Sequence, residues 1–124
     1  MLADLVLRQV HGSFAWFVIG SNAVAGLWAL GAHWFAPLRA RALWWCVGLA
    51  EMAIAIQVIL GVSLVVSAKL ELPRFHAFYG FFSLFFVGFM YAYRVQLRHR
   101  LYVMYGLGGL FLMGLAMRAF LLHR

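Results

Sequence analysis

Four long apolar runs separated by short polar breaks constrain this chain more than any other feature of its sequence. The runs cover residues 10–35, 42–68, 75–93 and 101–122. An α-helix needs about 20 apolar residues to cross the hydrocarbon core of a bilayer, and each run is close to that length or longer. Backbone groups in lipid must satisfy one another, and the runs lack the alternation that marks a β-barrel, so we expect a helix in each.

The predicted fold is an all-α integral membrane four-helix bundle, a single domain over residues 1–124. We expect the helices to run up-down-up-down with short turns, which places both termini on the same side. Only 10% of the residues are charged and 67% are hydrophobic, whereas a soluble domain has about 25% charged residues. This composition leaves no room for a separate soluble domain. The first residues carry Asp4 and Arg8 and no cleavage-site pattern, so we expect a short extension of the first helix rather than a removable signal.

The net charge of +7 does not predict nucleic-acid binding. The cations lie in the polar breaks beside apolar runs, where they anchor helix ends and meet anionic headgroups, so membrane lipids are the expected partners. Arginine far outnumbers lysine, which is typical of a GC-rich bacterial genome and favours a bacterial plasma membrane. Orientation stays open because the cations divide equally between the two sides: Arg8, Lys69, Arg74, Arg118 and Arg124 on the side of the termini, and Arg39, Arg41, Arg94, Arg98 and Arg100 on the other.

Each predicted helix carries a stripe of small and polar residues. Small residues let helix backbones approach, so we expect these stripes to face the bundle interior. The stripes contain His11, Ala15, Val18, Asn22, Ala25, Ala29 and His33; then Cys46, Ala50, Ala53, Gln57 and Gly61; then His76, Gly80, Ser83, Val87 and Arg94; and finally Gly106, Gly108, Gly109 and Gly114. Opposite the third stripe lie phenylalanines that we expect to face lipid: Phe78, Phe81, Phe82, Phe85 and Phe89.

His11 and His76 form the most specific candidate site in the sequence. Both lie near the starts of parallel helices on the side of the termini, and both belong to an interior stripe. Two histidines on facing helices can supply the axial ligands of a b-type haem, and through this pair the chain is similar to cytochrome-b-like membrane anchors. The alternative is that each histidine bonds a headgroup, water or a carbonyl. No other metal site is predicted, and His33 with His99 forms a looser pair on the opposite side.

Glu51 lies near the predicted bilayer centre, where an ionised carboxylate is costly. It is therefore either a proton or cation site, or a structural group that is protonated or paired with Arg94 or Arg118. Gln57 lies about 240° around the helix from Glu51 and cannot share its face. Arg94 is expected to extend toward the polar turn that follows it, where the cations are typical of an anchor for anionic lipid.

Few residues are available for enzyme chemistry. The chain has three acidic residues, one cysteine (Cys46) and no phosphate-binding loop. We therefore expect an accessory or anchor subunit of a bacterial membrane complex, with other subunits or copies of itself as partners, and haem b electron transfer as its sharpest form. The alternative is a homo-oligomeric, dual-topology transporter or channel using Glu51. The size and helix count are similar to those of small multidrug transporters and fluoride channels, but the transporters' membrane glutamate lies in the first helix. A lipid- or quinone-binding enzyme is a third, less favoured class.

Overall fold

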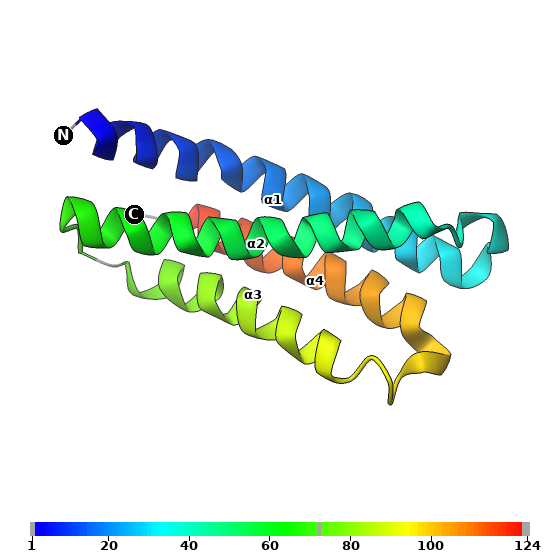
Figure 1. Ribbon diagram of the computed structural model, residues 1–124. Coiled ribbons are helices and arrows are strands. Elements are labelled where there is room, and N and C mark those ends of the chain that lie inside the picture. Colours follow the sequence, from blue (N-terminus) through cyan, green and yellow to red (C-terminus); the bar gives the residue numbers. More distant parts are fainter. Residues whose placement is uncertain (1, 72, 123–124) are drawn as a thin grey trace.

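The computed structural model describes residues 2–71 and 73–122, and within this part of the chain it contains four long helices and no strand (Figure 1). Each of these helices is long and apolar enough to cross a membrane, so the predicted all-α class with four candidate membrane spans is confirmed. The elements are α1 (Leu2–Trp34), the 3-10 turn η1 (Ala36–Leu38), α2 (Arg41–Ala68), α3 (Arg74–Ala92), the 3-10 turn η2 (Arg98–Arg100) and α4 (Leu101–Leu121).

Helix α1 starts earlier than the apolar run that predicted it. It has 33 residues, so at 1.5 Å per residue it is about 50 Å long, against a hydrocarbon core of about 30 Å. The extra turns carry Asp4 and Arg8, as the expected extension of the first helix would. The carboxylate of Asp4 accepts a hydrogen bond of 3.0 Å from the hydroxyl of Ser67. This contact ties the N-terminal turns of α1 to the last turn of α2.

In the connection between α1 and α2, Arg39 caps the C-terminal end of α1. Arg39 donates from Nε to the carbonyl of Ala32 at 2.6 Å and from Nη2 to the carbonyl of His33 at 2.7 Å. These are carbonyls at the end of a helix, which have no partner within the helix. Trp28 adds a hydrogen bond from its indole nitrogen to the carbonyl of Leu38, at 2.8 Å. The arginine therefore satisfies backbone groups rather than pairing with an acid.

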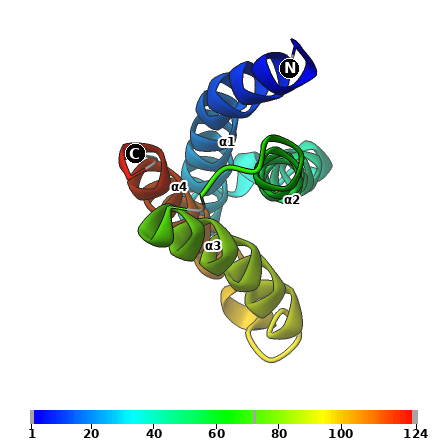
Figure 2. The ribbon, with the colours of Figure 1, turned by 90° about the vertical axis from the view of Figure 1, so that its left-hand side faces the viewer.

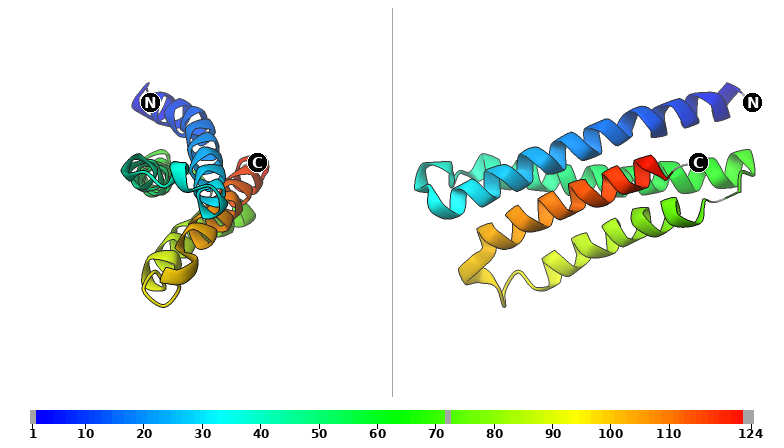
Figure 3. Two further views of the ribbon diagram at one scale, coloured as in Figure 1. Left: turned by 90° about the vertical axis from the view of Figure 1, so that its right-hand side faces the viewer. Right: turned by 180° about the vertical axis from the view of Figure 1, so that it is seen from behind.

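Consecutive helices point in opposite directions, and the N- and C-terminal ends lie toward the same end of the bundle (Figure 1). Helix α1 packs mainly on α4 and α2, α3 packs mainly on α4, and α2 and α3 touch only lightly. The views along the bundle show the N-terminal end of α1 spreading away from α3 and α4 (Figures 2 and 3). The bundle is therefore tightest along α1 and α4, and looser where α2 faces α3.

Glycines set the close approach of α1 and α4. A Cβ built on Gly106 would lie 2.6 Å from the backbone nitrogen of Leu30, and one on Gly26 would lie 2.8 Å from that of Leu110. Real Cβ atoms are not found this close to backbone, so only glycine fits at these positions. Around this contact the predicted interior stripes supply buried residues from three helices: Val18, Asn22, Ala25, Ala29, Ala50, Ala53 and Ser83.

Not all of the α3 phenylalanines that were predicted to face lipid are exposed. Phe78, Phe81, Phe85 and Phe89 are exposed, as expected. The prediction for Phe82 is wrong, because this ring packs against the buried core and lies 6.2 Å from the ring of Phe111 on α4. Helix α3 contacts the bundle chiefly through the glycine-rich α4, whose small side chains leave space for large rings. A strict division into polar and aromatic faces therefore does not hold.

Candidate functional site

The two histidines paired by the sequence lie together at the end of the bundle that holds the termini. The ring centroids of His11 on α1 and His76 on α3 are 5.8 Å apart, and the ring planes meet at 79°. Both side chains are half-buried. Helices α1 and α3 otherwise make little contact, so these rings bridge two helices that are not packing neighbours.

His76 is oriented by the last helix of the chain. Its Nδ1 lies 2.6 Å from the carbonyl oxygen of Ala119. A carbonyl only accepts hydrogen bonds, so Nδ1 carries the proton, and in the neutral ring the lone pair lies on Nε2. Such a bond from the second nitrogen fixes both tautomer and ring orientation in histidines that bind metals. Helix α4 therefore leaves Nε2 of His76 as the ligating or accepting atom.

Helix α2 holds the other histidine in place. The side-chain amide of Gln57 donates a hydrogen bond of 2.7 Å to the backbone carbonyl of His11. One turn further along α2, a Cβ built on Gly61 would lie 3.1 Å from Cε1 of His11, so the imidazole passes close to the helix backbone there. All four helices thus contribute to one junction, defined by His11, Gln57, Gly61, His76 and Ala119, which we call the histidine junction.

Two glycines near the histidine junction have no close neighbour. A Cβ built on Gly12 or on Gly80 would meet no atom within 4 Å outside its own helix. Near the end of α4, the ring centroids of Phe120 and of Trp16 on α1 are 4.9 Å apart, and the Arg118 guanidinium lies 5.6 Å from the centre of the ring of Tyr79 on α3.

Within residues 2–71 and 73–122, no group of three or more histidine, cysteine or acidic side chains could hold a metal ion. A pair of imidazoles alone is an incomplete coordination set for a free ion, because zinc sites use three or four protein ligands. It is a complete set of axial ligands for an iron whose other four positions are filled by a porphyrin. The donor set at the histidine junction therefore fits haem better than a bare metal ion.

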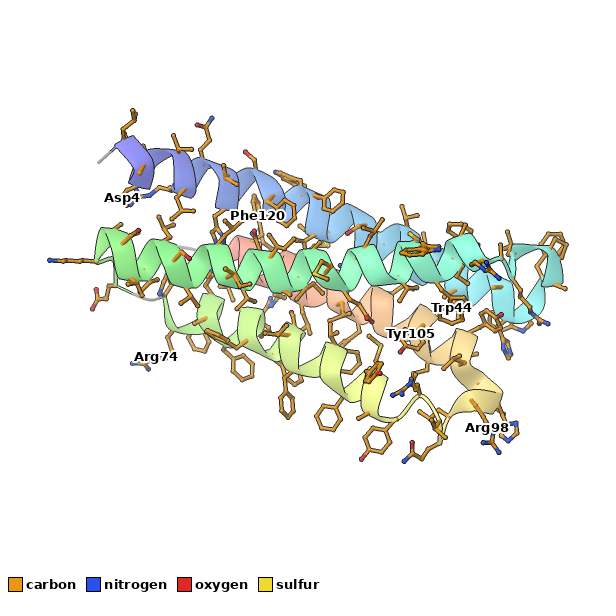
Figure 4. All side chains as sticks on the ribbon, viewed as in Figure 1. Asp4, Trp44, Arg74, Arg98, Tyr105 and Phe120 are labelled. Atoms are coloured by element: carbon orange, nitrogen blue, oxygen red, sulfur yellow. The ribbon has the colours of Figure 1, made fainter. Side chains whose placement is uncertain are left out.

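A second candidate site lies at the opposite end of the bundle, around Glu51. A cavity of about 280 Å³ is lined by Trp44, Val47, Gly48, Glu51, Arg94, Leu101 and Tyr105. We call it the Glu51 pocket. The Oε2 atom of Glu51 is buried there with no hydrogen-bond partner among the described residues. The rings of Trp44 and Tyr105 lie 5.5 Å apart at 84° and form neighbouring walls (Figure 4).

The two cations that the sequence predicts as possible partners of Glu51 lie toward different ends of the bundle. Arg94 lines the rim of the Glu51 pocket, where its guanidinium donates to the carbonyl of Tyr91 at 2.7 Å and lies 3.7 Å above the ring of that tyrosine. Arg118 lies near the other end of the bundle, beside Tyr79. Across residues 2–71 and 73–122, neither cation forms an ion pair with Glu51. The Glu51 carboxylate therefore faces a cavity that Arg94 also lines, without an ion pair between the two within the described residues.

The other polar candidates link helices. Asn22 is 1% exposed and donates from Nδ2 to the carbonyl of Val18 at 2.9 Å and to that of Ala50, on α2, at 3.3 Å. Gln57 faces α1 and Glu51 faces the cavity, as expected from their angular separation on the helix. The looser histidine pair is not brought together by any contact: His33 packs on Trp34, at 4.8 Å, while His99 lies exposed in η2.

Two features of these sites could not be predicted from the sequence. The carbonyl of Ala119 orients His76, and a backbone group on a distant helix has no signature in residue type. From the sequence alone, Trp44 and Tyr105 are typical of an interfacial aromatic belt, because Trp and Tyr near helix ends are usually found there, and nothing in it predicts that they line a cavity. Comparison of the chain with protein-family models, curated proteins and solved structures found no match.

Proposed function

We propose that this chain is a small multi-pass subunit of an electron-transfer complex in a bacterial plasma membrane, in which His11 and His76 would hold a b-type haem. The separation of the two imidazoles carries the proposal. Two metal–imidazole bonds of about 2 Å each place the ring centroids about 6 Å apart. The ring centroids of His11 and His76 are 5.8 Å apart.

The remaining residues of the histidine junction suit this role. Ala119 holds the proton on Nδ1 of His76, which leaves Nε2 for iron, and Gln57 anchors the helix turn that carries His11. Gly12 and Gly80 carry no side chain that would obstruct a ring bound beside the two histidines. When bound, haem supplies one-electron transfer, and the protein supplies ligation, orientation and a low-dielectric surrounding.

A subunit role is favoured over an independent enzyme. The chain has three acidic residues, of which two, Asp4 and Glu71, lie outside the apolar runs. Its exposed surface carries large apolar side chains on all four long helices, which suits lipid, a second copy or another membrane subunit as neighbours. In this proposal the helices alternate in direction across the membrane, and both termini, together with the histidine junction, lie on one side.

An absorption spectrum of the protein purified from its host membrane tests the haem proposal. We expect a Soret band and, on reduction, the α-band of a six-coordinate b-type haem. His11→Ala and His76→Ala should each abolish the low-spin spectrum, whereas His99→Ala, at an exposed histidine in η2, should leave it unchanged. Protein without any Soret band, both as purified and after reconstitution with haem, would overturn the proposal.

A further inference from the structure

The Glu51 pocket is a binding site separate from the histidine junction. The two sites share α2, where Glu51 lines the pocket and Gly61 contacts His11. Ten helical positions separate these residues, which is about 15 Å along the axis. We propose that the Glu51 pocket binds the head group of a membrane-soluble quinol. This inference does not depend on haem at the histidine junction.

The position of the pocket requires a ligand that comes from the membrane. Glu51 lies in the eleventh position of α2 (Arg41–Ala68), so at 1.5 Å per residue it is about 15 Å from the start of that helix. The pocket lies between α2 and the α3–α4 hairpin, where α2 and α3 are only lightly packed. A ligand with an apolar tail could place its head in the cavity and its tail among the acyl chains.

The charges of the pocket select against ionic head groups. A cationic head would be attracted by Glu51 but repelled by Arg94 at the rim, and an anionic head such as a phosphate would meet the opposite conflict. A neutral head that donates a hydrogen bond at one end and accepts one at the other satisfies both side chains. A quinol has this arrangement, because its two oxygens lie at opposite ends of one ring.

Glu51 supplies the acceptor that a quinol hydroxyl needs. Its Oε2 is buried and has no hydrogen-bond partner within the described residues. A buried polar atom left unpaired costs free energy, so a hydroxyl that donates to it gains more than it would from water. Arg94 keeps further N–H donors beyond the one directed at Tyr91, since a guanidinium carries five.

The walls and the size of the pocket fit one aromatic ring. Trp44 and Tyr105 present flat surfaces that meet nearly at right angles, which allows one to stack on a bound ring while the other contacts its edge. The other walls, Val47, Gly48 and Leu101, are apolar. The volume of about 280 Å³ is just below the range of about 300–1,000 Å³ found for small-molecule sites. It suits a head group rather than a whole lipid.

Binding is tested by titrating the full chain in lipid nanodiscs with a short-tailed naphthoquinol, under anaerobic conditions, and following tryptophan fluorescence. We expect saturable quenching that is largely lost in Trp44→Phe. Glu51→Gln and Arg94→Gln should each weaken binding about tenfold or more, the change that loss of one charged hydrogen bond produces. The matched controls Glu71→Gln and Arg98→Gln, at exposed positions outside the pocket, should bind like the wild type.

The dimethyl ether of the same quinol provides a second probe, because it keeps the ring and tail but has no hydroxyl to donate. We expect it to bind at least tenfold more weakly than the quinol to the wild type, and the two probes to bind alike in Glu51→Leu, which has no acceptor. Equal affinity of wild type and Glu51→Gln for the quinol would overturn the proposal. So would displacement of the quinol by a small quaternary ammonium ion in a Glu51-dependent manner, which would identify a cation site instead.

Discussion

Gly26 of α1 and Gly109 of α4 lie back to back, so that a Cβ built on Gly109 would come within 2.8 Å of the Cα of Gly26. The two helices meet through backbone at this point, with no side chain between them. In a membrane, where lipid is as apolar as leucine, such close backbone packing is a main source of helix association. The contact between α1 and α4 also positions Ala119, whose carbonyl contacts His76.

Gly109→Ala should therefore destabilise the bundle. An added methyl group must push one helix backbone away from another, and overpacking of this kind costs about 1–3 kcal/mol. This exceeds the gain of about 1 kcal/mol that alanine brings over glycine inside a helix. A lower midpoint of thermal unfolding in detergent is the expected observation.

Gly114→Ala is the matched control on the same helix. A Cβ there would meet no atom within 4 Å outside the local helix backbone, so only the helix-propensity gain remains. We expect an unfolding midpoint equal to or above that of the wild type. If both substitutions lower stability alike, close packing of α1 on α4 is not what holds these helices together.

Asn22 should contribute to the stability of the bundle through its hydrogen bond to α2. Asn22→Ala removes the hydrogen bond to the carbonyl of Ala50 at 3.3 Å, and hydrogen bonds between membrane helices are worth about 0.6–2 kcal/mol. Ser21→Ala removes only a bond within α1, to Val18 at 3.3 Å. We expect the first variant to unfold at a lower temperature and the second to stay within about 0.5 kcal/mol of the wild type. The comparison fails if Ser21→Ala is the more damaging change.

The fold class followed from the sequence because run length and polar breaks are local properties. The exact start of α1 did not, since the apolar run begins near Val10 whereas the helix begins at Leu2. A contact with Ser67 across the bundle holds Asp4 in the extra turns, and a one-dimensional pattern contains no such contact. The inward position of Phe82 could not be predicted for a similar reason, because it depends on which helix α3 packs against.

The candidate sites divide in the same way. The pairing of His11 with His76 was predictable, because both open parallel helices and belong to interior stripes. The carbonyl that orients His76 and the separation of Arg118 from Glu51 depend on how α4 crosses the bundle. Residue type and spacing on one helix do not determine that crossing. Glycine positions on α4 indicate only that some backbone comes close there.

Gln57→Leu tests how the histidine junction is supported. The substitution keeps side-chain volume but removes the amide that donates to the carbonyl of His11 at 2.7 Å. The turn of α1 that carries His11 should then become less well positioned, and the haem bound per protein should fall. The reduced-minus-oxidised absorbance per mole of protein measures this directly. Gln96→Leu, in the exposed turn after α3, is the control and should retain full occupancy.

A substitution of Glu51 tests whether this side chain stabilises the fold or lowers its stability. The carboxylate lies within a membrane helix, and its Oε2 is buried without a partner among the described residues. An unpaired acid at that depth costs about 2.5–3.5 kcal/mol, so Glu51→Leu should raise the thermal stability of the ligand-free protein by about 1–2 kcal/mol once some local relaxation is allowed for. Thermal unfolding in detergent, with Met52→Leu as an exposed neighbour for control, measures the change.

The same residue decides between a subunit and a transporter. A proton-coupled transporter needs a carboxylate that gains and loses a proton during turnover, so Glu51→Gln would stop flux without unfolding the protein. As a subunit of an electron-transfer complex, the wild-type chain should instead show no proton-coupled uptake in proteoliposomes, and Glu51→Gln should behave identically. Wild-type flux that disappears in a stably folded Glu51→Gln protein would assign the pocket to transport.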